Sequence, residues 1–361
     1  MEPLNLDEFE AAARETLPRM TYDFIAGGAE DEWSVAANRA ALAARALRNR
    51  VLVDVQHRDT RSRLLGLDLP HPIILAPTAL HRVAHPGGEL ETARGAAAAE
   101  ALYTVSTATS TRLEDIAAAA PSGLRWFQLY HLGAREATER LIAQAVATGH
   151  RAIALTVDVP LLGRRERDLR NGFALPEGVA MAHANEPAWA PPDEGPEDRS
   201  GRLSGGWASP IASANLSWDD LAWIREAAGG VPLLLKGIVR GDDARRALDR
   251  GVDGIWVSNH GGRQLDHAIP TLDALLDVVA AVGGQCPIVM DGGIRRGTDA
   301  LKALALGADA VAIGRPQLYG LAVGGAGGVQ RVVELLRAEL DLALALVGAP
   351  SLADLVPDLV V

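Results

Sequence analysis

Short apolar runs alternate with Ala- and Leu-rich stretches of helical period from residue 70 onward, and this alternation constrains the fold most. It indicates repeated βαβ units, which build a parallel sheet. Because each run is apolar nearly throughout, the strands should be buried on both faces. The predicted strands are Ile73–Ala76, Tyr103–Ser106, Leu124–Leu129, Ala152–Val157, Leu233–Leu235, Gly254–Val257, Pro287–Met290 and Ala310–Ile313.

Eight parallel strands favour a closed α/β barrel, the (β/α)8 or TIM barrel. The alternative is an open, doubly wound sheet. No GxGxxG motif follows the first strand, however, and Gly87-Gly88 lies well past it. The chain of 361 residues is long for one domain, but single barrels reach this length. We therefore expect one domain over residues 1–361.

Residues 1–69 are expected to form a helical and hairpin segment ahead of the barrel. Leu17-Pro18 should end a first helix and Gly27-Gly28 a second, because proline and glycine interrupt helices. A third helix is predicted over residues 31–47, and a connecting hairpin over residues 51–69.

Residues 178–215 interrupt the repeating pattern after the fourth strand, with Pro191-Pro192, Gly195-Pro196 and Gly205-Gly206 among acidic residues. Long loops inside compact domains are usually functional lids or disordered segments. We predict a long, flexible active-site loop here.

The formal net charge of −11 argues against nucleic acid and anionic lipid as partners. A small anionic substrate would then need a local cationic pocket. Cys286 is the one cysteine, so neither an internal disulfide nor a cysteine-rich metal site is possible, and no metal is expected. No signal peptide or apolar membrane span is recognisable, so we expect a cytoplasmic protein.

Polar residues follow every predicted strand. In a (β/α)8 barrel the active site lies at the carboxyl ends of the strands, so these residues should converge there. They are Pro77-Thr78-Ala79, Ser106-Thr107, Gln128-Leu129-Tyr130, Thr156-Val157-Asp158, Lys236-Gly237, Ser258-Asn259-His260, Asp291-Gly292-Gly293 and Gly314-Arg315.

The loops after the last two strands suggest a phosphate site. Gly293 and Gly314 let the backbone approach an anion closely, and Arg295 and Arg315 offer guanidinium groups that match phosphate oxygens. The alternative is two ordinary turns with solvated arginines.

Four further side chains have the chemistry of a reaction centre. His260, flanked by glycines, could act as a base near neutral pH, and Asp158 could orient it. Arg165 and Arg263 could clamp a carboxylate. A fifth residue, Lys236, could form a Schiff base, stabilise a developing negative charge or make a structural ion pair.

At these positions the sequence resembles the FMN-dependent 2-hydroxy-acid oxidase and dehydrogenase family. The resemblance covers nearly the whole chain and is most specific in SNHGGRQLD, DGGIRRGTD and IGRP. Further matching segments are YDFIAGGAEDEWSVAANRAAL, IILAPTAL, STATSTRLEDIA, RWFQLY, ALTVDVPLLGRRERDLRNGFALP and LLLKGI. The resemblance implies FMN as cofactor and oxidation of an (S)-2-hydroxy acid to the 2-keto acid, with O2 as acceptor and H2O2 as product. It also implies a homo-oligomer, a tetramer or an octamer.

The resemblance also implies roles for individual residues. His260 corresponds to the catalytic base, Asp158 to its partner and Tyr130 to the tyrosine at the reacting hydroxyl. Arg165 and Arg263 correspond to the pair that binds the substrate carboxylate, and Lys236 to the cation beside the reduced flavin. The implied FMN contacts are Thr78, Ala79, Ser106, Gln128, Thr156, Lys236, Ser258, Asp291, Gly293, Arg295, Gly314 and Arg315.

Two positions depart from the pattern of glycolate oxidase, a member of this family. Phe24 stands where that enzyme has a tyrosine that contacts the carboxylate, and Ala108 stands where it has a tryptophan over the pocket. Both changes favour a bulkier, mandelate-like substrate. The 4-hydroxymandelate oxidase branch shares DFxAGG and RDxRNGFALPE with this chain.

Several alternatives stay open. The acceptor could differ from O2, which would make the protein a dehydrogenase. The substrate could be lactate, a long-chain 2-hydroxy acid or a peptide- or carrier-bound acid. An FMN-dependent isomerase and a flavin-binding module without catalysis are rival functions, although SNHGGRQLD disfavours the first and the presence of His260, Arg263, Lys236 and Tyr130 the second.

Overall fold

A computed structural model describes residues 3–183 and 214–361. Its centre is a closed barrel of eight parallel strands, in which the last strand pairs with the first. This confirms the predicted (β/α)8 architecture. The barrel strands are β3 (Ile73–Leu75), β4 (Leu102–Ser106), β5 (Arg125–Leu129), β6 (Ile153–Thr156), β7 (Leu233–Ile238), β8 (Gly254–Val257), β9 (Ile288–Asp291) and β10 (Ala310–Ile313).

The strand boundaries agree with the predicted ones to within one residue, except at the end of β7. Lys236 and Gly237 were expected to follow this strand, but it continues to Ile238. A bulge between Lys236 and Ile238 allows the extension, because Gly237 has a φ of +109° that few other residues could adopt. Lys236 is therefore part of the barrel wall.

Side chains alternate between the inside and the outside of the barrel. Ile74, Trp126, Ala154 and Val289 form one buried cluster inside it. The hairpin of β1 (Ser62–Leu64) and β2 (Leu67–Leu69) adds Leu64, Leu67 and Leu69 to the same cluster. This predicted hairpin contributes apolar side chains to the barrel interior, so the interior is a packed core rather than a pore.

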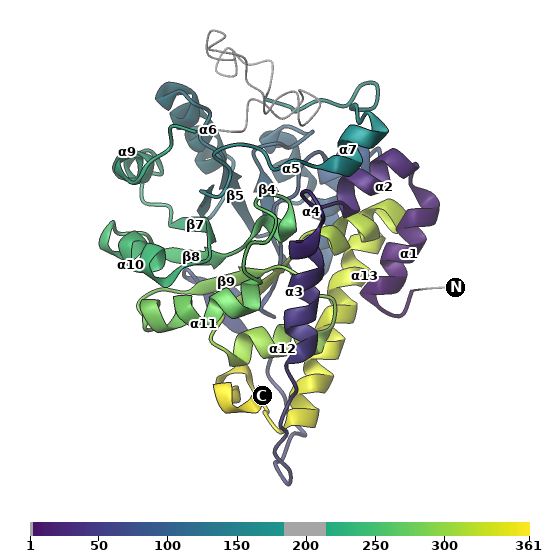
Figure 1. Ribbon diagram of the computed structural model, residues 1–361, viewed down its shortest axis with the longest axis vertical. Coiled ribbons are helices and arrows are strands. Elements are labelled where there is room, and N and C mark those ends of the chain that lie inside the picture. Colours follow the sequence, from purple (N-terminus) through teal and green to yellow (C-terminus); the bar gives the residue numbers. More distant parts are fainter. Residues whose placement is uncertain (1–2, 184–213) are drawn as a thin grey trace.

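The helices form an outer layer around the strands (Figure 1). Those that follow barrel strands pack their apolar faces on the outward-pointing strand residues in a second, larger cluster. They are α4 (Gly88–Ala98), α5 (Leu113–Ala119), α6 (Arg135–Ala147), α7 (Glu166–Asn171), α9 (Leu221–Ala227), α10 (Gly241–Asp249), α11 (Thr271–Val282), α12 (Gly297–Ala305) and α13 (Arg315–Val347).

The three expected N-terminal helices are α1 (Leu6–Thr16), α2 (Arg19–Ala26) and α3 (Trp33–Ala44). The first two end at Leu17-Pro18 and Gly27, as predicted. The third is shorter than predicted, because the chain is extended from Arg45 and Leu47 pairs with Val360 near the C-terminus. Figure 1 shows α1 and α2 beside α13, and α3 in front of it.

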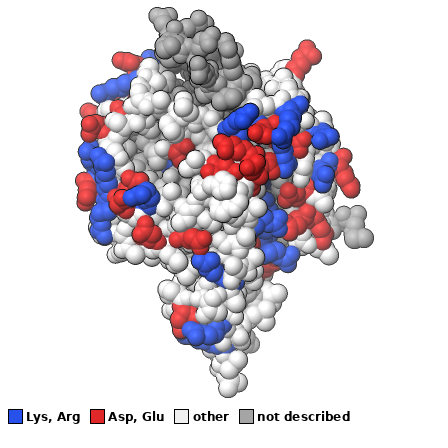
Figure 2. All heavy atoms as spheres, viewed as in Figure 1, with Lys and Arg blue, Asp and Glu red and all other residues white. Residues whose placement is uncertain are grey.

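Most of the predicted loop at residues 178–215 lies outside the described residues. No helix within residues 3–183 and 214–361 combines the length and the apolar character that a membrane span needs. Figure 2 shows acidic and basic side chains side by side over one face. Many of them are paired, as Arg225 is with Asp253 and Arg240 with Asp242.

Candidate active site

A cavity opens at the carboxyl ends of the barrel strands, where the polar strand-end residues were expected to meet. Most of the predicted site residues line it. They are Phe24, Thr78, Ala79, Ser106, Gln128, Tyr130, Thr156, Arg165, Lys236, His260, Arg263, Asp291, Gly293, Arg295, Gly314 and Arg315. Two others lie behind this lining: Asp158 hydrogen-bonds to His260, and Ser258 to Lys236.

His260 is held between a carboxylate and a phenol. Its Nδ1 lies 3.0 Å from Asp158 Oδ1, and its Nε2 lies 3.4 Å from the Tyr130 hydroxyl oxygen. Because a carboxylate accepts hydrogen bonds, Nδ1 carries the proton and Nε2 presents a lone pair to the cavity. The ring is thus set to accept a proton there.

The charge states of this pair follow from burial and mutual attraction. Burial lowers the pKa of His260, and the positive charges of Lys236 and Arg165 add to that effect, although Asp158 opposes it. Burial by itself would raise the pKa of Asp158, but the charge and hydrogen bond of His260, together with Lys236, hold it below its usual range. Near neutral pH the pair is therefore a neutral imidazole and a carboxylate.

The backbone around His260 is unusual. His260, Gly261 and Gly262 all have positive φ, at 57°, 62° and 75°. A Cβ on Gly262 would come within 2.7 Å of the Val35 backbone nitrogen, so α3 could not approach this turn if the residue were larger. The His260 N–H donates to Ser258 Oγ over 3.0 Å, which connects the turn to the end of β8.

Arg165 and Arg263 bring two guanidinium groups into the cavity. Burial lowers the pKa of both, to about 9 for Arg263, which also feels Arg165. Both stay charged at neutral pH. Arg165 Nε is buried without a hydrogen-bond partner among the described residues. A buried cation with an unused donor favours an anionic ligand, because the anion replaces the hydrogen bonds to water that burial removed.

The N-terminal segment closes one side of the cavity. Arg263 Nη1 donates to the carbonyl oxygens of Phe24 and Gly27, over 2.9 and 2.7 Å. Arg315 donates to the carbonyl oxygens of Ile25, Gly27 and Gly261. Because a helix C-terminus is the negative end of its dipole, these cations hold the end of α2 over the barrel.

Phe24, near the end of α2, lines the cavity and is held in place by the ring of Phe173 and the guanidinium of Arg263. Its ring stacks on Phe173 with centroids 4.2 Å apart and an interplanar angle of 5°. The Arg263 guanidinium lies 5.4 Å from the centroid of the Phe24 ring. The aromatic face of Phe24 is therefore a rigid part of the cavity wall.

Lys236 belongs to a buried network on the other side. Its Nζ donates to Ser258 Oγ over 2.9 Å and lies 3.4 Å from Asp291 Oδ2. Ser258 Oγ donates in turn to Asp291 Oδ1, and Trp256 Nε1 donates to Asp291 Oδ2. The lysine is thus a compensated cation at the cavity, as a group that stabilises negative charge would be.

The polar wall formed by β3 to β6 is also a connected network. Ser106 Oγ donates to Gln128 Oε1 over 3.0 Å, and Gln128 Nε2 donates to Thr156 Oγ1 over 2.9 Å. Thr78 Oγ1 accepts a hydrogen bond from Gln317 Nε2 over 3.1 Å. Each of these side chains is held in one orientation toward the cavity.

The predicted phosphate site fits an anionic group. Gly293 has a φ of +83°, and a Cβ there would come 2.8 Å from the Asn38 carbonyl group. Arg295 Nε is buried with no hydrogen-bond partner within the described residues. The nearby start of α13, at Gly314, has no side-chain cap, which suits an anion, although Pro316 has no N–H and the Gln317 N–H donates to the Gly314 carbonyl oxygen. These features suit the phosphate of FMN.

Ala108 differs from its predicted place. Its side chain is completely buried, and it is not among the residues that line the cavity in the described part of the chain. Its N–H donates to Ser106 Oγ over 3.1 Å, so it supports the wall from behind. A role for Ala108 in substrate choice stays a prediction.

Sequence reasoning missed the second ring of the aromatic stack, Phe173, and the apolar lining residues Ile25 and Leu318. No local signal marks them, since all three are ordinary apolar positions next to helix ends. Within residues 3–183 and 214–361 no group of three His, Cys, Asp or Glu side chains could hold a metal ion.

Comparisons with known proteins cover the chain from end to end. A model of the family described as FMN-dependent dehydrogenase matches residues 13–361. Glycolate oxidase 3 of Arabidopsis thaliana is 44% identical over 358 residues, which is 98% of this chain and 95% of that protein. L-lactate oxidase of a Nostoc species is 47% identical over 357 residues, or 98% of this chain and 96% of that protein.

Solved structures of mandelate oxidase are also similar. The structure with (S)-4-hydroxymandelic acid has a TM-score of 0.90 and 42% identity, and the match covers 98% of both chains. The structure described only as mandelate oxidase has a TM-score of 0.89 and 42% identity, over 99% of this chain and 98% of the other.

Proposed function

This chain belongs to the FMN-dependent dehydrogenase family, and from that premise we propose that it oxidises an (S)-2-hydroxy acid to the corresponding 2-keto acid. The observation that supports this most is the cavity in which the proton-accepting face of His260 meets two arginines, the buried Arg165 and the half-buried Arg263. A base and a carboxylate clamp side by side match a substrate that has its hydroxyl group next to its carboxylate.

The arginines bind and orient the substrate. Arg165 has a buried donor to offer, and Arg263 is held by the carbonyl groups of Phe24 and Gly27. A carboxylate between them would replace water as their partner and align the 2-hydroxyl group with His260. Uncharged alcohols bind less well, because the buried Arg165 Nε would then stay without an acceptor.

His260 and Tyr130 act on the 2-hydroxyl group. His260 Nε2 accepts its proton, while the Nδ1 proton stays on the hydrogen bond to Asp158. The negative charge of Asp158 stabilises the imidazolium that results. Tyr130, whose pKa is raised by burial and by Asp158, stays protonated and donates a hydrogen bond at the same place.

FMN is the cofactor of this family and, when bound, would take up the C2 hydrogen of the substrate together with the two electrons of that bond. Gly293, Arg295 and the start of α13 would hold its phosphate group. Lys236 supplies a positive charge that is fixed by Ser258 and Asp291. With FMN bound, this charge would stabilise negative charge on the reduced cofactor.

The proposed substrate is bulky and aromatic, of the mandelate type. Phe24 presents an aromatic face without a hydroxyl group, and Phe173 and Arg263 hold it in place. Solved mandelate oxidases with 4-hydroxymandelic acid bound are among the similar structures. The alternative is a smaller acid, because two of the curated relatives are named glycolate oxidase and L-lactate oxidase.

We propose O2 as the final acceptor, with H2O2 as product, since the curated relatives are named as oxidases. A cytoplasmic homotetramer is proposed as the working form. Light scattering on the purified protein measures the assembly directly.

Anaerobic titration of the purified FMN protein tests the reaction. We expect mandelate and 4-hydroxymandelate to bleach the flavin absorbance at lower concentrations than lactate, glycolate or a long-chain 2-hydroxy acid. Admission of air should restore the colour with formation of peroxide. Bleaching that air does not reverse would indicate a dehydrogenase with another acceptor.

Two other results would change the assignment. Bleaching by glycolate or lactate alone would refute the aromatic substrate while leaving the reaction intact. No bleaching by any free acid would refute the proposed reaction on free acids.

A further inference from the structure

A second cavity, of about 260 Å3, lies next to the candidate active site and has no part in the proposed reaction. Tyr130 and Thr156 border both cavities. Successive residues of a strand point to opposite faces, so Thr156 points into the barrel while Leu155 and Val157 point outward. The two cavities are thus separated by one strand layer.

The walls of the second cavity are largely apolar. Leu155 and Leu235 contribute from the outer face of the barrel, and Leu216 and Leu221 from the segment around the start of α9. The volume is slightly below the range of about 300–1,000 Å3 that is usual for small-molecule pockets. A molecule with two fused aromatic rings would fit such a space.

His131 borders this cavity and is 6% exposed. Thr156 and Tyr130 border it too, but their hydroxyl groups lie against Gln128 and His260 at the first cavity. The neighbour of His131, Thr138, donates through Oγ1 to the Ala134 carbonyl oxygen over 2.9 Å and accepts the Leu132 N–H over 3.1 Å. The Thr138 proton is therefore already used. His131 Nδ1, 3.1 Å from the same oxygen, must be the donor in their contact.

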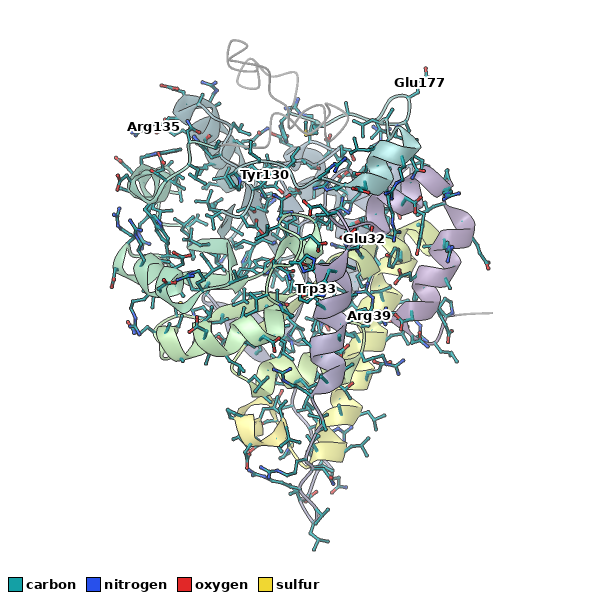
Figure 3. The ribbon with its side chains drawn as sticks, in the orientation of Figure 1. Glu32, Trp33, Arg39, Tyr130, Arg135 and Glu177 are labelled. Atoms are coloured by element: carbon teal, nitrogen blue, oxygen red, sulfur yellow. The ribbon has the colours of Figure 1, made fainter. Side chains whose placement is uncertain are left out.

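This leaves His131 Nε2 as a bare acceptor. Burial lowers the pKa of His131, although Asp220 opposes the effect, so the ring is neutral near pH 7. Nε2 makes no hydrogen bond within residues 3–183 and 214–361. The ring itself is held against Trp223, with centroids 5.8 Å apart, and Arg135 covers Trp223 from outside. Figure 3 shows Tyr130 in the interior and Arg135 at the outer margin.

Among the other polar side chains at the cavity, Trp218 offers an indole N–H donor, whereas Ser217 and Asp243 offer none. Ser217 Oγ donates to Asp220 and accepts the Asp219 N–H. Asp243 brings a half-buried carboxylate, which can only accept. The two acceptors, His131 Nε2 and the Asp243 carboxylate, favour a ligand with an N–H or O–H donor, and the carboxylate repels an anion.

We propose that the second cavity binds a small, neutral, flat aromatic molecule with one hydrogen-bond donor, of the indole or phenol type, and that the donor binds to His131 Nε2. Such a ligand is chemically distinct from the anionic substrate of the first cavity. Because His131 follows Tyr130 directly, the site lies one residue from the proposed reaction centre.

Calorimetric titration of the FMN-bound protein with two matched probes tests the proposal. Indole and benzofuran have nearly the same shape, but benzofuran has an oxygen in place of the N–H. We expect one indole per chain and at least tenfold weaker binding of benzofuran. Equal affinities, or no detectable binding of indole, would overturn the proposal.

Variants locate the site. His131→Phe keeps a ring against Trp223 and leaves Thr138 with its other two partners. It should weaken indole about tenfold and leave benzofuran unchanged. Leu216→Trp should fill the cavity and abolish binding of both probes.

Leu276→Trp is the matched control, because Leu276 is 44% exposed on α11 and does not border the cavity. It should bind indole as the wild type does. Indole binding that survives both His131→Phe and Leu216→Trp would show that the ligand sits elsewhere. The titration measures binding and not turnover, so its outcome is independent of the proposed oxidation.

Discussion

His260 shows how much of the proposed chemistry depends on the surroundings of one residue. Asp158 determines which ring nitrogen bears the proton, and Tyr130 marks where the other nitrogen points. Burial and the nearby cations keep the ring neutral before substrate binds. A histidine in water has none of these constraints, so its pKa and tautomer would both be averaged.

Replacement of this base should separate binding from chemistry. We expect His260→Ala to slow flavin reduction by a 2-hydroxy acid by a factor of about 10²–10⁴ while FMN stays bound. Stopped-flow absorbance under anaerobic conditions measures the rate. His267→Ala, in the same loop but at an exposed position, should reduce FMN at the wild-type rate. A His260→Ala rate near that of the wild type would refute the base assignment.

The same residue predicts the pH profile of kcat/KM. Activity should rise with pH through the pKa of His260, which lies below its ordinary value of about 6.5, because only the neutral ring accepts a proton. Initial rates between pH 5 and 10 test this. A lower limb centred above pH 7 would contradict the assignment.

The missing hydroxyl group at Phe24 should affect the choice between glycolate and mandelate as substrate. Phe24→Tyr adds a hydroxyl group next to the carboxylate clamp and should raise kcat/KM for glycolate about tenfold, with little change for mandelate. A hydrogen bond to a charged group contributes about 1.5–3 kcal/mol, which is enough for this factor. Phe173→Tyr changes the other ring of the stack, outside the cavity lining, and should alter neither value. Equal gains for both acids would count against this role.

At the scale of elements, the strands and helix ends determine which side chains meet. The carboxyl ends of β6, β7 and β8 bring Asp158, Lys236 and His260 to one place from positions up to 102 residues apart. The end of α2 then closes over them through Arg263 and Arg315. The barrel therefore brings the reactive side chains together, and the N-terminal segment covers them.

The packing of helix α13 depends on glycine, because a larger residue would not fit where its two parts meet. The helix is interrupted at Gly324 and Gly325, whose backbone angles are not helical, and the two parts meet where Gly328 touches the Gly320 carbonyl group. We expect Gly328→Ala to lower the free energy of unfolding by about 1–3 kcal/mol, because its Cβ would overlap that carbonyl.

Gly327→Ala is the matched control, since a Cβ there meets nothing within 4 Å. It should be neutral or stabilising by about 0.5–1 kcal/mol, as alanine is the better helix former. Thermal unfolding of both variants measures the difference. If Gly328→Ala were as stable as Gly327→Ala, the close contact would not matter for stability.

At the scale of the whole molecule, the chain combines a net charge of −11 with a cavity lined by four arginines. The cations Arg165, Arg263 and Arg315 have lowered pKa values, since burial and mutual repulsion both oppose their charge. Anionic ligands relieve this cost, so FMN and substrate should stabilise the fold as well as react in it.

Removal of FMN should therefore lower the melting temperature by several degrees. Ligand at one hundred times its dissociation constant adds about 2.7 kcal/mol to the free energy of unfolding. Differential scanning calorimetry of the apoprotein with added FMN or riboflavin measures this gain. Riboflavin lacks the phosphate for Arg295 and the start of α13, so it should restore less stability than FMN. Equal effects would contradict the phosphate site.

Much of this site could be predicted because strand order is visible in the sequence. The residues after each apolar run, such as Gln128, Asp158 and His260, had to converge once eight parallel strands closed into a barrel. The family resemblance then assigned their roles. The end of β7 was misplaced, because Gly237 ends an apolar pattern but continues a strand through a bulge.

The sequence by itself determined the number of strands, the edge at which the polar groups gather and the need for a cationic pocket, since these depend on local periodicity and residue type. Tertiary structure decided the stack of Phe24 on Phe173, the burial of Ala108 behind the wall and the cavity at His131. These depend on distances between segments that are far apart in the chain. Such distances arise only when helices pack against the closed barrel.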